Sequence, residues 1–232
     1  ADTQPAHAPS SKTWRFTWPN PLTSFVGRKQ DLARLTSILA TTRLITLTGV
    51  GGVGKTRLAL EFIELVQKGF PDGVWWVDLA PLAQSELVPR SVANVLGVKE
   101  EVGQAVVDTL IEAWREKTAW IVLDNCEHLI QACAQLTEAL LRGCRNLKIL
   151  ATSREVLGLT GEVIFAVPPL STPTDPDQVT DDILERYDAV RLLADRAAAA
   201  LPGFEIASGN RQVAARLCVQ LDGIPLALEL AA

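Results

Sequence analysis

Residues 45–62 read ITLTGVGGVGKTRLALEF, and this stretch decides the fold. An apolar run typical of a strand precedes a glycine-rich loop, and apolar residues at helical spacing follow the loop. From Gly49 to Thr56 the loop matches the pattern G-x-x-x-x-G-K-[ST], in the strand-then-helix setting that the pattern requires. We therefore predict a phosphate-binding loop between a buried strand and a helix.

The residue types of this loop suit a triphosphate. Backbone N–H groups must converge on the phosphates, and glycine leaves that approach open and allows positive φ. The following helix adds its N-terminal amides and the positive end of its dipole. We expect Lys55 to reach the β- and γ-phosphates of a nucleotide and the Thr56 hydroxyl to bind Mg²⁺. The predicted nucleotide-binding residues of this stretch are Gly49, Gly51, Gly52, Val53, Gly54, Lys55, Thr56 and Arg57. The alternative is a glycine-rich turn with an exposed lysine, which the strand-then-helix setting disfavours.

An acidic residue suited to Mg²⁺ ends another apolar run, AWIVLDN at residues 119–125. In open α/β sheets, ligands bind at the carboxyl ends of the strands, where Asp124 would lie. We expect Asp124 to hold Mg²⁺ through water, together with Thr56. The alternative, a strand-end aspartate that caps the next helix, is the weaker interpretation once a phosphate loop is present.

The residue after this aspartate is Asn125. Many ATPases of this kind carry an acid there, which polarises the attacking water. Asparagine cannot accept that proton, although it could orient water by hydrogen bonding. Glu127 is the nearest carboxylate downstream, and we expect it in the first turn of the next helix, where the dipole favours it; catalysis by Glu127 is the second interpretation. The sequence therefore predicts nucleotide binding with slow hydrolysis.

A cation follows a further strand candidate, LKILATS at residues 147–153. Arg154 could face the γ-phosphate, because a guanidinium matches phosphate oxygens in a bidentate manner. The alternative is a surface arginine on a loop. The predicted catalytic residues are Lys55, Asp124, Asn125 and Arg154, and the predicted metal ligands are Thr56 and Asp124.

Strand and helix patterns alternate along the chain, which predicts an α/β fold with a parallel sheet covered by helices on both faces. The predicted strands are 44–48, 74–79, 119–125, 147–153 and 163–167, and the predicted helices are 55–67, 86–96, 104–116 and 127–142. Prolines from residue 168 onward end this alternation, and only helices follow, at 183–200, 210–221 and 225–232. We expect a linker or disordered arm at 1–21, a nucleotide-binding domain at 22–172 and a helical domain at 173–232.

Composition excludes several classes of protein. The 232 residues carry a net charge of −5, which provides no overall field for nucleic acid or an anionic membrane. No apolar run reaches the ~20 residues of a membrane span, and no signal peptide is apparent. The four cysteines form no C-x-x-C pair, so we expect buried, reduced thiols in a cytoplasmic protein. The chain lacks methionine and stops inside an apolar helical pattern, which suggests a fragment whose helical domain is incomplete.

Several segments together resemble the nucleotide-binding core of STAND ATPases, which include NB-ARC proteins and bacterial regulators of the LuxR and AfsR type. They are TSFVGRKQDLARL, LTGVGGVGKTRLAL, VWWVDLAPL, IVLDNCEHL, LKILATSREVLGLTGE, VPPLS and LDGIPLALELAA. The resemblance implies a P-loop NTPase sheet of AAA+-like order 5-1-4-3-2 and a sensor role for Arg154. It also implies that Val26, Gly27 and Arg28 lie beside adenine, and that Pro225 packs against the nucleotide.

The resemblance further implies a switch: an ATP- or ADP-binding module, with Mg²⁺, within a larger signalling or transcription regulator. Winged-helix, repeat-sensor and effector domains are expected elsewhere in the parent chain, and the ATP state could self-assemble. A small-molecule phosphotransferase is the alternative, although no lid or acceptor site is visible. Direct DNA binding by this segment is a third interpretation, which the acidic charge disfavours. We expect no nucleic acid and no membrane as partners.

Overall fold

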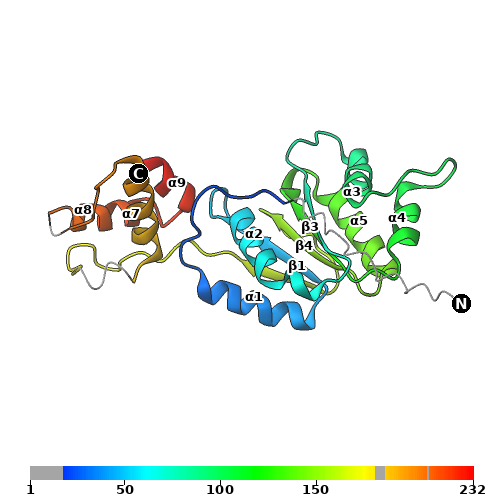
Figure 1. Ribbon diagram of the computed structural model, residues 1–232, viewed down its shortest axis with the longest axis horizontal. Helices are drawn as coiled ribbons and strands as arrows, with labels where there is room; N and C mark the ends of the chain where they lie inside the picture. The colour runs from blue at the N-terminus through cyan, green and yellow to red at the C-terminus, as the bar shows by residue number, and fades with distance from the viewer. Residues whose placement is uncertain (1–17, 181–185, 208) are drawn as a thin grey trace, which may run out of the picture.

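The computed structural model describes residues 18–180, 186–207 and 209–232, and it contains a five-stranded parallel sheet with a group of helices beside it (Figure 1). The strands are β1 (Leu44–Thr48), β2 (Val74–Asp78), β3 (Trp120–Asp124), β4 (Lys148–Ser153) and β5 (Glu162–Ala166). Their order is β2-β3-β4-β1-β5, and every neighbouring pair is parallel. This is the order 5-1-4-3-2 read from the other edge, so the predicted α/β sheet is confirmed.

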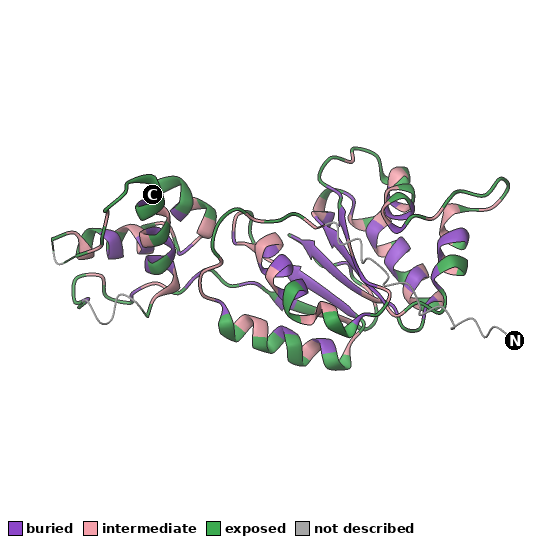
Figure 2. Ribbon diagram, in the orientation of Figure 1, coloured by how far each residue is buried: buried purple, intermediate pink, exposed green. Residues whose placement is uncertain are grey.

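Helices cover both faces of the sheet, because successive side chains of a strand point to opposite faces. Trp120 and Val122 of β3 pack with α1 (Lys29–Thr41) and α2 (Lys55–Val66). Ile121 and Leu123 of the same strand pack on the other face. The helices there are α3 (Val88–Leu96), α4 (Val106–Trp114) and α5 (Ile130–Gly143). Figure 2 shows buried residues along the strands and on the inner sides of these helices. The central strands therefore read as continuous apolar runs, as strands buried on both faces should.

Three short 3₁₀ helices occur among the described residues, at Gln67–Gly69, Ser85–Leu87 and Cys126–His128. The last of these corrects a prediction. Glu127 lies in this 3₁₀ turn and not in the first turn of α5, which begins at Ile130. The reason is backbone conformation: Asn125 adopts the left-handed region, with φ 63°, and turns the chain before the helix can begin.

The helices beyond the sheet are α7 (Asp188–Ala200), α8 (Arg211–Gln220) and α9 (Pro225–Ala231), which we call the helical group. They enclose their own apolar cluster, which includes Leu170 and Val179 from the connecting segment. Part of the predicted helix at 183–200 lies outside the described residues. Figure 1 shows this group at one end of the molecule, at the opposite end from α3, α4 and α5.

The N-terminal arm predicted at 1–21 lies largely outside the described residues, Trp14 included. Trp18 packs against the apolar cluster under α1 and α2. All four cysteines are buried, and none forms a disulfide. Among the described residues, no helix combines the length and apolarity needed to cross a membrane.

Candidate functional site

The loop between β1 and α2 needs glycine for its backbone and for its neighbours. Gly52 and Gly54 have φ of 77° and 94°, values that residues with a Cβ rarely adopt. A Cβ on Gly52 would lie only 2.9 Å from the Cβ of Leu226, which belongs to α9. A side chain at Gly52 would therefore collide with α9. The same short distance shows that the helical group contacts the loop directly.

The amides at the start of α2 are available to an anion. Gly54 is the residue before the helix, and no side chain caps it. In the described part of the chain, the N–H groups of Gly52, Gly54, Lys55 and Thr56 donate to no backbone or side-chain acceptor of the protein. Uncapped amides at a helix N-terminus, with the dipole behind them, favour negative charge. This arrangement fits a phosphate group.

The side chain of Lys55 folds back over the phosphate loop that precedes it in the sequence. Its Nζ donates to the carbonyl oxygens of Gly49 at 2.8 Å and Val50 at 3.2 Å. Burial lowers the pKa of Lys55, whereas the nearby Glu127 carboxylate raises it. The ammonium therefore lies at the mouth of the loop, where it donates hydrogen bonds to two carbonyl oxygens. A phosphate oxygen could take the place of these carbonyls as its acceptor.

Asp124 is a buried carboxylate at the end of β3, and three side chains donate hydrogen bonds to it. The Thr56 hydroxyl donates to Oδ1 at 2.9 Å, the Thr152 hydroxyl donates to the same oxygen, and the Asn125 amide donates to Oδ2 at 3.2 Å. Burial raises the pKa of Asp124, while the bonds from Thr152 and Thr56 lower it. A hydroxyl and a carboxylate are the hard oxygen donors that Mg²⁺ prefers, so Thr56 and Asp124 fit the predicted ion.

Asn125 supports Asp124 from both its backbone and its side chain. Its backbone N–H donates to the Thr152 hydroxyl at 3.0 Å, and its side-chain amide donates to the aspartate. Asn125 makes both bonds while in the left-handed conformation. The structure thus brings Asn125 beside the predicted metal ligand, and its catalytic role stays a prediction.

Arg154 follows β4 and pairs with a carboxylate. Its Nε lies 3.5 Å from Oε1 of Glu127. The Arg154 side chain is 65% exposed, and its Nη2 lies 3.1 Å from the place of a Cβ on Gly51. The guanidinium therefore stands over the phosphate loop, and the sequence had no signal for its pairing with Glu127.

The segment at residues 21–28 contacts both the phosphate loop and the helical group. The Arg28 guanidinium is buried and donates to the Val53 carbonyl at 2.6 Å, while the Arg28 N–H donates to Asp188 of α7 at 3.2 Å. Burial lowers the pKa of Arg28, and the carboxylates of Asp31 and Asp188 oppose that effect. Arg28 therefore ties the phosphate loop to α7 through this segment.

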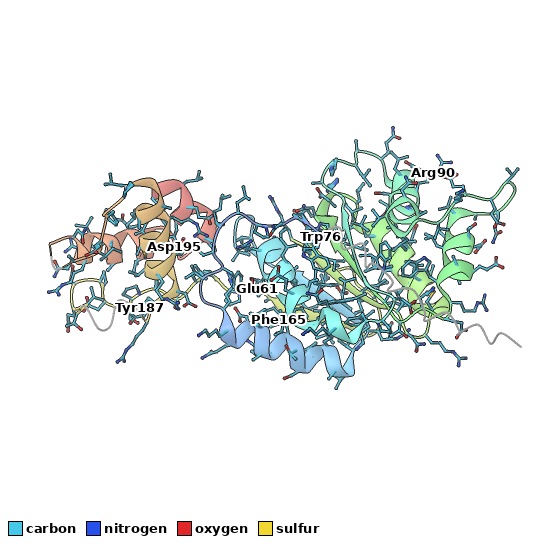
Figure 3. The ribbon with its side chains drawn as sticks, viewed as in Figure 1. Glu61, Trp76, Arg90, Phe165, Tyr187 and Asp195 are labelled. Carbon is cyan, nitrogen blue, oxygen red and sulfur yellow. The ribbon has the colours of Figure 1, made fainter. Side chains whose placement is uncertain are left out.

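A second set of bonds holds the same segment. Arg196 of α7 donates to the Ser24 carbonyl at 2.9 Å and to the Ser24 hydroxyl at 3.0 Å. It also donates to Glu229 of α9 at 2.9 Å, and it pairs with Asp195, which Figure 3 labels on α7. On the other side, Arg57 of α2 donates to the Thr23 carbonyl.

These elements enclose a cavity of about 510 Å³. Of the predicted site residues, its lining includes Val26, Arg28, Gly51, Gly52, Gly54, Lys55, Thr56, Arg57, Asn125, Arg154 and Pro225. Gly27, Gly49, Val53 and Asp124 do not line it. The prediction did not include Thr23, Ser24, Phe25, Leu192, Arg196, Leu226 and Glu229, which also line the cavity. They come from segments far apart in the chain, so no local pattern could have signalled them.

The fold and the site together define a STAND-like P-loop ATPase core. The parallel sheet has the order of that class, and it carries a phosphate loop after β1, an aspartate at the end of β3 and an arginine after β4. Comparison with known families agrees. Residues 38–171 match the family described as AAA domain, and the chain belongs to that family. This fold implies nucleotide binding.

The relatives place such a segment in longer proteins. An uncharacterized protein of Mycobacterium tuberculosis is 41% identical over 91% of this chain and 50% of its own length. A putative HTH-type transcriptional regulator of the same organism is 43% identical over 84% of this chain and 20% of its own. The chain therefore spans half or less of these curated relatives.

Among solved structures, a STAND protein with a tetratricopeptide repeat sensor from Pyrococcus horikoshii has a similar fold. The TM-score is 0.55 at 20% identity, over 95% of this chain and 31% of that one. The predicted P-loop class is confirmed.

Proposed function

We propose that this chain is an ATP- or ADP-binding regulatory switch module with slow ATP hydrolysis, within a larger signalling or transcription regulator. The observation that carries the proposal is a bond between domains: the Leu226 N–H of α9 donates to the Gly52 carbonyl of the phosphate loop at 3.2 Å. Pro225, beside it, lines the same cavity. A change in what the loop holds would therefore alter the docking of the helical group.

The chain's own residues account for binding in this proposal. The loop amides and Lys55 hold the phosphates, and Thr56 and Asp124 hold Mg²⁺. Bound Mg²⁺ would neutralise charge on the phosphates. The 21–28 segment and Pro225 cover the rest of the nucleotide. A ligand shifts an equilibrium only by binding two arrangements unequally, and contacts from two domains to one ligand supply that difference. Signal input, effector output and self-assembly in the ATP state are proposed for the longer regulator.

The proposal is tested by purifying the chain without added nucleotide and identifying what it retains by chromatography. We expect ADP, because a closed module that hydrolyses ATP slowly would keep its product. Protein that is free of nucleotide and that transfers phosphate rapidly to an added metabolite would favour the phosphotransferase alternative instead.

The Arg196→Ala variant should release bound nucleotide about tenfold faster, since it removes the bonds that tie Ser24 to α7 and α9. Tenfold corresponds to ~1.4 kcal/mol, the usual net worth of one or two hydrogen bonds. Stopped-flow dissociation of a fluorescent ADP analogue measures the rate.

Arg216→Ala is the matched control for this variant. It also removes an arginine ion pair of the helical group, to Asp177, but that pair does not touch the cavity. Equal release rates for the two variants would show that the 21–28 segment does not retain nucleotide.

A further inference from the structure

Glu127 lines the cavity, while the side chains of its two chain neighbours are held elsewhere. Cys126 is fully buried and its thiol donates to the Leu123 carbonyl, and the His128 ring bonds the Leu82 carbonyl at 2.9 Å. The left-handed turn at Asn125 sets up this 3₁₀ segment. Glu127 between them lines the cavity beside Lys55 and Arg154.

One oxygen of this carboxylate has no partner. Oε1 lies 3.5 Å from the Arg154 Nε, whereas Oε2 is buried and has no hydrogen-bond partner among the described residues. Leaving a buried acceptor unsatisfied costs about 1–3 kcal/mol, and more for a charged group. Glu127 as a residue lines the cavity, so a ligand and its water can supply the donor that this buried oxygen lacks.

Two other carboxylates, Asp124 beside Thr56 and Glu229 in the cavity lining, are already engaged. Asp124 accepts from Thr56, Thr152 and Asn125, and Glu229 accepts from Arg196. Asn125 commits its amide to Asp124 and has no basic atom to offer. Within the described chain, Glu127 is therefore the carboxylate at the phosphate end of the cavity with a free basic oxygen.

We infer that Glu127 is the general base for ATP hydrolysis and that Arg154 restrains it until a γ-phosphate draws the guanidinium away; this inference rests on the proposed function. The water oxygen attacks the γ-phosphorus while one water proton passes to the Glu127 carboxylate. The bond from the γ-phosphorus to the β–γ bridging oxygen breaks, and its electrons stay on ADP. Phosphate and ADP are released, and Glu127 returns the proton to solvent.

The position of Arg154 suggests how the base is restrained. Its guanidinium pairs with Glu127 and also stands over Gly51 of the phosphate loop. A γ-phosphate at the loop would compete for the same cation, because guanidinium binds phosphate strongly. Arg154 would then leave Glu127 when ATP is bound and return to it in the ADP state. Hydrolysis is slow in this scheme because Glu127 can accept a proton only after the γ-phosphate has drawn Arg154 away from it.

The test is Glu127→Gln, which keeps the shape of the side chain and removes the base. We expect single-turnover hydrolysis of radiolabelled ATP with Mg²⁺ to slow at least 100-fold, within the ~10²–10⁴ range of general-base catalysis. Affinity for ATP should stay within about threefold, the range expected when only a transition-state interaction is lost. As a readout apart from activity, the variant should be purified with ATP bound where the wild type retains ADP. Glu138→Gln, which removes another arginine-paired glutamate far from the cavity, should behave as wild type.

A double variant with Arg154→Ala separates catalysis from positioning. The double variant should hydrolyse ATP more slowly than Arg154→Ala alone, whereas equal rates would mean that Glu127 acts only through Arg154 and would overturn the inference. Hydrolysis by Glu127→Gln at the wild-type rate, or retention of ADP by that variant, would also overturn it. If the wild type binds ATP without hydrolysing it, this inference fails and nucleotide binding stands. If the wild type binds no nucleotide, the proposed function fails as well.

Discussion

Lys55→Ala is expected to weaken ATP binding at least 100-fold, or about 3 kcal/mol. The ammonium is the cation of the phosphate loop, and it already lies at the loop mouth on the carbonyls of Gly49 and Val50. A charge-assisted contact to phosphate in a partly desolvated site is worth more than an ordinary hydrogen bond, about 1.5–3 kcal/mol each. The alanine removes the charge, whereas the conformation of the loop, which depends on its glycines, should not change. Calorimetric titration with Mg²⁺ and ATP measures the change.

Lys148→Ala is the control for this substitution. Lys148 is also a partly buried lysine whose ammonium donates to backbone carbonyls, those of Leu39 and Thr42, but it lies outside the cavity. Its loss should leave ATP affinity unchanged. Unchanged affinity in Lys55→Ala, with the fold intact by circular dichroism, would refute the phosphate-loop assignment.

Gly223→Ala should destabilise the helical group by about 3 kcal/mol. Gly223 has φ of 63°, and a left-handed residue with a Cβ costs roughly 1–2 kcal/mol. The added Cβ would also lie 2.2 Å from the Leu170 carbonyl oxygen, and overpacking adds roughly 1–3 kcal/mol. That carbonyl cannot easily move, because the Leu170 N–H donates to the Gly223 carbonyl at 2.9 Å. Hydrogen exchange along α7, α8 and α9 should therefore accelerate.

Gly203→Ala is the control that separates the backbone strain of a left-handed alanine from the steric clash with the Leu170 carbonyl. Gly203 lies in the loop between α7 and α8 and has φ of 87°, but an added Cβ would meet nothing within 4 Å. This variant should cost only the backbone term, roughly 1–2 kcal/mol. If both variants unfold at the same denaturant concentration, the contact between Gly223 and Leu170 contributes nothing measurable to the docking of these helices.

The fold was largely predictable because its signals are local. The apolar runs that became β1, β3 and β4 and the glycine-rich loop are readable from short windows of sequence. The position of Glu127 was not predictable. Its 3₁₀ turn depends on the left-handed Asn125, which is stabilised by bonds to Asp124 and to Thr152 of the neighbouring strand. The roles of the site residues toward nucleotide stay predictions.

The sequence by itself determined the α/β class and the phosphate loop, because strand burial, helix periodicity and glycine φ are properties of neighbouring residues. Only the tertiary structure decided which groups meet at the loop. The sheet order brings the ends of β1, β3 and β4 side by side, so Thr56 reaches Asp124 and Arg154 reaches Glu127. The docking of α9 adds Leu226 to Gly52. Such contacts join residues far apart in the chain and depend on packing, which no local pattern encodes.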